Sequence, residues 1–558
     1  MRLVCALGLM ACLASPARAQ DVPVGGCETG QALRFLESPE MQVSLFNTGG
    51  LFFGGSTTSG DGYLIPKASG NSPFFAAGFW LGGTVDGDLR VAAARYGGYD
   101  FWPGPLEDAA NPPQDCSTHD RIYVVSRDDI REYYLTGTAT DDLRDWPHQL
   151  GAPVIDGDGV DGNYNLAGGD QPDLIGDHAA WWVMNDAGND HDPGAPLGVE
   201  VRVHAFLYGE AGEVTSPALS QTSFYRYEIL NRGDTPIEQM YATLFSDPDL
   251  GGAGDDYVGT DTLRNMVFVY NDRNADVAYG TAPPAQGIQV LQGPVGLANR
   301  RDDDFDGTVD EPGERLGATS TSVLIGGGPD GTQDPGTPQE YYRYMQGLWG
   351  NGTPIYEWSH GFEQTGRPVT RFTYPGDPVT ESFWSEVNTD GNGTESVMGD
   401  RRMMVATGPF ELAPDSSTTV LYAMPYGRGT DYLQSVAVMR SYAGALQGVF
   451  RNGPLRRQPV DGTPGGQRDA NGDVSISRVH PNPASSSPDA LLTLPAEARV
   501  RAAVYDALGR QLAVLVDGEL AAGEITLEMP AGLAPGAYVL RIQVNPGVEE
   551  TISFTVVR

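Results

Sequence analysis

Short runs of alternating hydrophobic and polar residues dominate the chain and predict β-strands. The runs are bounded by Gly, Pro, Asn and Asp, the residues that favour turns. Two pairs of runs are joined by short turns and predict hairpins: 223–230 with 237–245, and 403–412 with 418–426. Further strands are expected at 199–208 and 266–270. The pattern predicts an all-β fold with a β-sandwich body over residues 20–450, and leaves open whether the body divides into two sandwiches near residue 200.

One segment has helical periodicity instead. Between residues 431 and 450, apolar side chains recur at the spacing of one helix face. These are Leu433, Val436, Met439, Ala443, Leu446 and Phe450. Thr430 precedes them and is the predicted N-cap. We expect one long helix that closes an edge of the sheet.

The C-terminal region separates from the body by composition. Residues 451–474 carry almost no apolar side chains and many Gly, Pro, Arg and Asp, which is typical of a linker. Residues 475–558 then contain several short alternating runs with turn residues between them. This pattern predicts a second, small β-sandwich.

Three motifs in this last segment resemble the C-terminal sorting domain of the type IX secretion system. They are HPNPA at 480–484, VYDALGR at 504–510 and LAPGAY at 533–538, followed by a basic last residue, Arg558. The motif residues are Pro481, Asn482, Pro483, Gly509, Arg510, Gly536 and Tyr538. His480 stands where the family more often has an aromatic residue. The resemblance implies an envelope with an outer membrane, the type IX machinery as partner, and release or anchoring at the cell surface.

Four segments of the body are also similar to segments of large secreted proteins of Bacteroidota-like bacteria that carry the same sorting tail. They are residues 51–55, 101–106, 180–186 and 247–251. This resemblance implies a secreted β-rich body and no particular chemistry.

The first 19 residues have the pattern of a secretory signal peptide. Arg2 is followed by an apolar segment too short to span a bilayer, and Ala17-Arg18-Ala19 has the small-x-small form of a cleavage site. Cleavage between Ala19 and Gln20 would take the chain to the periplasm. A lipoprotein signal ending at Cys12 is the alternative. No later stretch is apolar and long enough for a transmembrane helix.

Removal of the signal leaves two cysteines, Cys27 and Cys116. An exported chain with two cysteines allows a single intramolecular pairing, so a Cys27–Cys116 disulfide is predicted. Two thiols too far apart to meet are the alternative.

The charge of the chain excludes one class of partner. The 73 acidic residues outnumber the 35 basic ones, and the formal net charge is −38. Such a surface repels a phosphate backbone, so nucleic-acid binding is not expected.

Local signatures of catalysis are missing. The sequence has no GxSxG elbow and no HExxH helix. His178 and His191 flank the segment 181–186, where nearby Asp residues would suit an acid–base or metal site. A turn cap for His178 and a solvated loop for His191 are the preferred interpretation.

Two functions from different classes remain. The first is a non-catalytic surface or matrix module that binds a glycan, a protein or its own copies. The alternative is a secreted hydrolase that carries no short motif. The missing signatures favour the first.

An acidic loop at 301–314 predicts a calcium site. Carboxylates alternate at Asp302, Asp304 and Asp306, before a glycine that allows a sharp turn. The other predicted ligands are the Thr308 carbonyl, Asp310, and Glu311 or Glu314. The loop resembles the D-x-D-x-D-G type but has Gly313 where an EF-hand has its last glutamate. A solvated acidic loop is the alternative.

Two weaker calcium candidates follow the same logic. The first is Asp156, Asp158 and Asp161; the second is Asp247, Asp249, Asp255 and Asp256.

Overall fold

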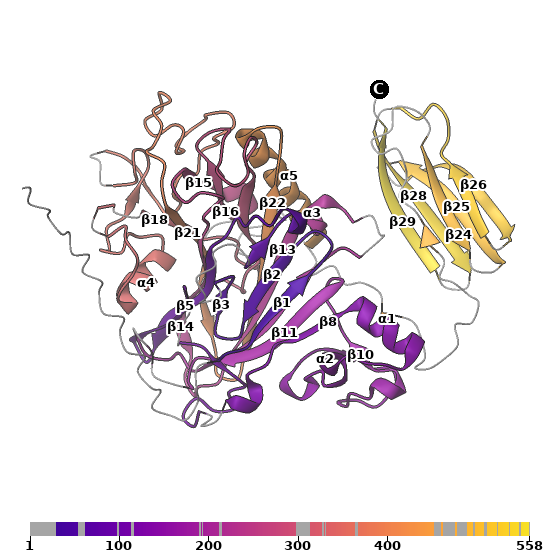
Figure 1. Ribbon diagram of the computed structural model, residues 1–558, viewed down its shortest axis with the longest axis horizontal. Helices are drawn as coiled ribbons and strands as arrows, with labels where there is room; N and C mark the ends of the chain where they lie inside the picture. The colour runs from indigo at the N-terminus through magenta and orange to yellow at the C-terminus, as the bar shows by residue number, and fades with distance from the viewer. Residues whose placement is uncertain are drawn as a thin grey trace, which may run out of the picture. The chain divides into compact units, whose positions relative to one another are not determined.

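The computed structural model describes most of the body and of the C-terminal region. The described residues are 30–53, 62–96, 100–112, 116–188, 191, 194–210, 215–296, 313–325, 328–329, 331–362, 366–450, 459–460, 475–476, 488–494, 497–506, 510–521, 523–534, 536–545 and 548–556. The chain divides into two compact units: a body made of Met1–Arg131 and Ala139–Val460, and a unit that holds Asp461–Arg558. The fold is mostly β, as predicted (Figure 1).

Two nine-stranded antiparallel sheets form the body. The first, sheet A, has the order β1 (Leu33–Glu37), β2 (Gln42–Phe46), β3 (Gly50–Leu51), β5 (Ala76–Val85), β14 (Ile237–Asp247), β21 (Arg401–Leu412), β18 (Ser320–Ile325), with β4 (Tyr63–Leu64) on β2 and β6 (Asp88–Ala93) on β5. The second, sheet B, has the order β15 (Asp256–Asp261), β16 (Met266–Asn271), β17 (Ala285–Gln292), β22 (Ser417–Gly427), β13 (Thr222–Asn231), β12 (Val199–Leu207), β11 (His178–Asn185), β7 (Trp102–Pro103), with β8 (Tyr123–Ser126) on β11.

The two sheets face each other across one apolar core. Phe79 on β5 of sheet A stacks on Tyr227 on β13 of sheet B, with ring centroids 3.9 Å apart and planes 3° from parallel. Large side chains from both sheets belong to the same buried cluster. Burial of this apolar surface is the main force that holds the sandwich together.

Smaller elements decorate the sandwich. The two-stranded pairs are β9 (Val154–Ile155) with β10 (Gln171–Pro172), and β19 (Ile355–Tyr356) with β20 (Val369–Thr370). The α-helices are α1 (Arg127–Thr136), α2 (Asp141–Arg144), α3 (Pro217–Ser220), α4 (Pro338–Met345) and α5 (Tyr432–Phe450). Short 3-10 turns cover Lys67–Ser69, Ser117–His119, His148–Leu150, Leu166–Gly168 and Thr262–Arg264. Among the described residues, no helix is long and apolar enough to cross a membrane.

The two predicted hairpins are wrong, although their strands are present. β13 lies in sheet B and β14 in sheet A, and β21 and β22 are divided between the sheets in the same way. Each connection is therefore an arch from one sheet to the other. β13 pairs with β22 and β14 pairs with β21, so the two arches lie against each other. β14 pairs with β5 and β21, which are distant in sequence, and this interior position in sheet A buries it along almost its whole length.

Residue 200 lies inside the sandwich and divides nothing. β12 begins at Val199 and runs through sheet B between β11 and β13. In sheet A, β5 from the first part of the chain pairs with β14 from the second. Each sheet therefore contains strands from before residue 200 and strands from after it.

Helix α5 has the predicted length and buried side, with two corrections. Val436, Met439 and Phe450 are buried as expected. Asp431 caps the helix in place of Thr430, because its Oδ1 accepts the Gln434 N–H at 2.8 Å. The helix packs on the face formed by β16, β17 and β22, not on an edge. The reason is that this face carries apolar side chains on β16 that need cover.

The C-terminal unit is a small β-sandwich, as predicted. One sheet has the order β23 (Ser475–Ile476), β24 (Asp489–Leu494), β27 (Gly523–Glu528); the other has the order β26 (Gln511–Leu520), β25 (Ala498–Asp506), β28 (Gly536–Asn545), β29 (Val548–Val556). Leu492, Val504 and Leu540 belong to one buried cluster that both sheets share.

Part of the predicted linker belongs to the body. Val460 is buried, and its backbone N–H and carbonyl both bond the side chain of Gln171. The rest of 451–474, apart from Pro459, lies outside the described residues.

Candidate metal centres

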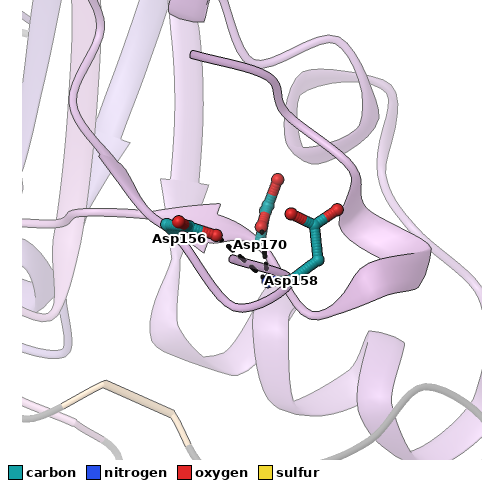
Figure 2. Close-up of side chains that lie close together, drawn as sticks. All are labelled: Asp156, Asp158 and Asp170. Atoms are coloured by element: carbon teal, nitrogen blue, oxygen red, sulfur yellow. Dashed lines mark hydrogen bonds between the residues drawn. The ribbon is translucent and has the colours of Figure 1, made fainter. Parts of the chain in front are cut away.

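Two groups of three aspartates could hold a metal ion among the described residues. The first, here called the β9–β10 triad, consists of Asp156, Asp158 and Asp170 (Figure 2). One carboxylate oxygen from each lies within 4.8 Å of the others. Asp156 follows β9 and Asp170 precedes β10, so the antiparallel pairing of these two strands brings the ends of the loop together.

The loop satisfies most of these carboxylates with its own hydrogen bonds. Asp170 is fully buried and accepts the N–H groups of Gly157 at 2.9 Å and Asn165 at 2.6 Å. Asp156 accepts the backbone N–H of Asp158 at 3.1 Å. Hydrogen bonds from the side chains of Asn165 and Asn163 hold the pKa of Asp158 below its ordinary value. Hydrogen bonds within the loop therefore hold the β9–β10 triad in place.

The carboxylates that lie together in this loop differ from the predicted ligand set by one residue. Asp156 and Asp158 converge, but the third member of the triad is Asp170 and not Asp161. Asp161 is exposed on the loop. Alternate spacing along the chain pointed to Asp161; the pairing of β9 with β10, which brings in Asp170, is two residues long and carries no sequence signal of its own.

The second group, here called the β14–β21 triad, consists of Asp247, Asp249 and Asp400. Asp247 is the last residue of β14, and Asp400 directly precedes β21. These strands are antiparallel neighbours, so the two residues lie at the same end of sheet A. Again one oxygen from each carboxylate lies within 4.8 Å of the others.

The predicted partners of Asp247 and Asp249 were Asp255 and Asp256. Asp400 takes their place in the β14–β21 triad. Asp256 begins β15 and accepts the Leu250 N–H at 3.2 Å, and it is not a member of the triad.

A tyrosine and an arginine contact the β14–β21 triad. Tyr96 donates its hydroxyl proton to Oδ2 of Asp247 at 2.8 Å and accepts the Nε–H of Arg402 at 2.7 Å. Arg402 also donates to Oδ2 of Asp400 at 3.0 Å. Burial raises the pKa of Asp247 to about 7, against the charge of Arg402, and the charges of Asp249 and Asp400 add to the rise. Burial raises the pKa of Asp249 as well.

Most of the main predicted calcium loop lies outside the described residues. This applies to Asp302, Asp304, Asp306, Thr308, Asp310 and Glu311. Glu314 is described and half-buried, and its carbonyl accepts the Gly296 N–H at 3.1 Å. The site stays a prediction. Ala19, Gln20, Cys27, Pro481, Asn482, Pro483 and Gly509 also lie outside the described residues.

The second cysteine is described. Cys116 is buried against Trp102. Because Cys27 is not among the described residues, the pairing of the two stays a prediction.

His178 and His191 are separate structural residues. The ring of His178 bonds the Gly209 carbonyl at 2.9 Å. His191 is buried, where a solvated loop was expected, and its ring nitrogens face the carbonyls of Val91 and Asp186. The Asp186 carboxylate accepts three backbone N–H groups, including that of Val199 at 2.7 Å. Both ring nitrogens of His191 and Nε2 of His178 are thus occupied by backbone carbonyls.

The tryptophans serve the core. Seven of the eight are buried, and Trp358 is half-buried. Trp80, for example, stacks on Phe245 and meets the edge of Tyr341 from α4. This fits the interpretation of the aromatics as core residues rather than sugar-stacking platforms.

Comparisons with known proteins give only distant structural likeness. No known family and no curated protein matches the sequence. Among solved structures, similarity is found to a polysaccharide lyase (TM-score 0.19, 8% identity, 68% of this chain and 39% of that chain). Dimeric latent PorU from Porphyromonas gingivalis follows (TM-score 0.14, 10% identity, 68% and 31%). The adhesin domain of Epf from Streptococcus pyogenes is a third (TM-score 0.11, 9% identity, 68% and 87%).

The chain spans less than half the length of the first two of these structures. Likeness at this level does not carry a fold or a function from any of the three proteins to this one.

Proposed function

We propose that this chain is an exported protein that type IX secretion machinery carries through the periplasm and across an outer membrane, to the cell surface or the medium. Its C-terminal unit, residues 475–558, would be the sorting domain. One observation carries the proposal: this unit has its own apolar core, built from two sheets, apart from the body. A sorting signal that must be read on many different cargoes needs a fold that does not depend on the cargo.

The described motif residues support this function in two ways. Tyr538 on β28 stacks on Phe554 with centroids 5.5 Å apart, and its hydroxyl donates to the Ala534 carbonyl at 2.6 Å. The LAPGAY segment thus builds the sandwich. Arg510 is exposed immediately before β26, in the connection from β25. The VYDALGR segment would therefore present a side chain to the machinery.

For the body we propose a non-catalytic binding or structural module with calcium-stabilised loops. Its ligand would be a glycan or a protein at the cell surface. Support comes from His178 and His191, which are occupied by structural hydrogen bonds. The two acidic triads give the body places for a cation.

A secretion assay tests the sorting function. Deletion of residues 475–558 should leave the body in the periplasm, because the signal peptide takes the chain no further. In the converse experiment, residues 451–558 are fused to the C-terminus of a carrier protein that has the same signal peptide. The carrier should then reach the cell surface or the medium. Both are compared in a host with type IX secretion and in a strain that lacks it. Truncated protein in the medium at normal yield would contradict the proposal.

A substitution of Arg510 separates recognition from folding in the same assay. Arg510→Ala should reduce secretion while the unit stays folded, because the side chain is exposed. The matched control is Arg541→Ala, which also removes an exposed arginine from this unit. It should be secreted like the wild type.

A further inference from the structure

We infer that Asp247, Asp249 and Asp400 bind one divalent cation of the calcium class at the end of sheet A. The site would tie together the end of β14, the loop that follows it and the start of β21. The inference rests on the proposal that cations stabilise loops of the body. To that proposal it adds where the cation binds, which residues bind it and how many ions bind.

Buried oxygens without a donor point to a ligand here. Asp247 is 4% exposed, and its Oδ1 accepts no hydrogen bond from any described residue. Oδ1 of Asp400 is also buried and accepts no hydrogen bond from any described residue. Asp256, which is not a member of the triad, is 1% exposed, and its Oδ1 has no donor among the described residues either. A buried carboxylate oxygen without a partner is costly, and a cation removes that cost.

The neighbouring side chains leave these oxygens free. Tyr96 and Arg402 both approach Asp247 on Oδ2, at 2.8 Å and 3.5 Å. Arg402 bonds Asp400 on Oδ2 as well. The contacts orient each carboxylate and leave its other oxygen available. The β9–β10 triad differs, because its carboxylates accept hydrogen bonds from their own loop.

The charge of the site matches one divalent ion. The three carboxylates carry three negative charges when ionised, and Arg402 contributes one positive charge. Asp334 also contacts Arg402 at 3.6 Å, but it is paired with Arg95 at 3.1 Å. Two negative charges remain.

The donor set selects a hard cation. All three side chains offer carboxylate oxygens, with neither sulfur nor imidazole among them. Calcium accepts roughly six to eight oxygens in flexible geometry, so loop carbonyls and water can complete its shell. Magnesium demands a stricter octahedron and should bind more weakly.

Calcium titration of the full mature chain tests the site. The protein is stripped with a chelator and titrated with calcium chloride by calorimetry, and thermal unfolding is followed in parallel. Asp249→Asn with Asp400→Asn should bind one calcium ion fewer than the wild type and show a smaller calcium-induced rise in Tm. An unchanged number of bound ions would overturn the inference. The double variant Asp304→Ala with Asp306→Ala, in the predicted 301–314 loop, must leave this site intact.

Two controls separate cation binding from damage to the fold. Asp334→Asn removes a carboxylate that contacts Arg402 from outside the triad, and should bind calcium like the wild type. Without calcium, Asp249→Asn with Asp400→Asn should unfold at the same or a higher temperature than the wild type, because repulsion is removed. A lower Tm both with and without calcium, with the full number of ions bound, would show a structural role only and overturn the site.

Terbium gives an independent readout on the protein with its ligands unchanged. Terbium(III) replaces calcium and emits when a neighbouring aromatic ring transfers energy to it. The Tyr96 hydroxyl contacts Asp247, so Tyr96→Phe should lower the sensitised emission per bound ion. Equal emission from wild type and Tyr96→Phe would contradict a cation at this place. Export does not enter either experiment, so failure here leaves the secretion assay to decide the sorting function.

Discussion

His191 is a buried imidazole placed between two backbone carbonyls, those of Val91 and Asp186. A neutral ring has one N–H, whereas the protonated ring can donate to both carbonyls. Burial by itself would lower the pKa of His191, but the nearby carboxylates of Asp100 and Asp186 and the two carbonyls raise it above its ordinary value. The folded surroundings of His191 therefore favour its protonated form.

The raised pKa of His191 predicts a pH dependence of stability. A group whose pKa is raised on folding contributes its full stabilisation of the folded state at pH values below its unfolded pKa, which is ordinarily 6.5 for histidine. That contribution is lost as the pH rises through the folded pKa. His191→Gln should cost about 2 kcal/mol of unfolding free energy at about pH 5.5 and less at about pH 9. Urea unfolding at the two pH values measures this. An equal loss at both would contradict a charged His191.

The exposed His360 supplies the matched control. His360→Gln should stay within about 0.5 kcal/mol of the wild type at both pH values, as expected of a surface substitution.

At the scale of elements, the paired arches organise the sandwich, and Asn231 joins them. Its side-chain amide donates to the carbonyls of Thr235 and Leu412, both at 2.9 Å, and its Oδ1 accepts the Gly233 N–H. Its backbone N–H donates to the Ser416 carbonyl of the other arch at 3.0 Å. Asn231 thus bonds both arches.

Substitution of Asn231 should destabilise the body strongly. The side chain is fully buried, and Asn231→Ala removes its donor from the buried Leu412 carbonyl and from the part-buried Thr235 carbonyl. We expect a loss of about 3 kcal/mol in unfolding free energy, measured by denaturant titration. Asp234→Ala, at an exposed position of the same connection, should change it by no more than about 0.5 kcal/mol. A similar small loss for both variants would show that Asn231 does not hold the arches.

At the scale of the whole molecule, the chain consists of two units with separate cores. The C-terminal unit expressed alone should therefore unfold in one cooperative transition. Tyr538→Phe keeps the ring on Phe554 and removes the hydrogen bond to Ala534, and should lower stability by about 1 kcal/mol. Tyr505→Phe is the control, because among the described residues the Tyr505 hydroxyl makes only an exposed 3.4 Å contact with Gln511. Chemical denaturation of the isolated unit checks both, and a gradual, non-cooperative transition would contradict a separate core.

Local order could be read from the sequence because alternation and helical spacing are properties of neighbouring residues. The strands 223–230 and 403–412, the buried side of α5 and the small C-terminal sandwich were predicted on this basis and are present. The identity of the helix cap was missed by one residue, since both Thr430 and Asp431 are good N-caps and only the backbone decides between them.

Which strand pairs with which was decided by the tertiary structure. A turn such as 231–236 permits a hairpin or an arch, and the pairing of β14 with the distant strands β5 and β21 placed it in the other sheet from β13. The same limit applied to the metal centres. Asp170 and Asp400 joined their triads through strand pairing between distant segments, whereas spacing along the chain pointed to Asp161 and Asp256. Periodicity along the chain indicates whether a residue is buried or exposed. Which residue lies opposite it in the neighbouring strand depends on how the whole core is packed.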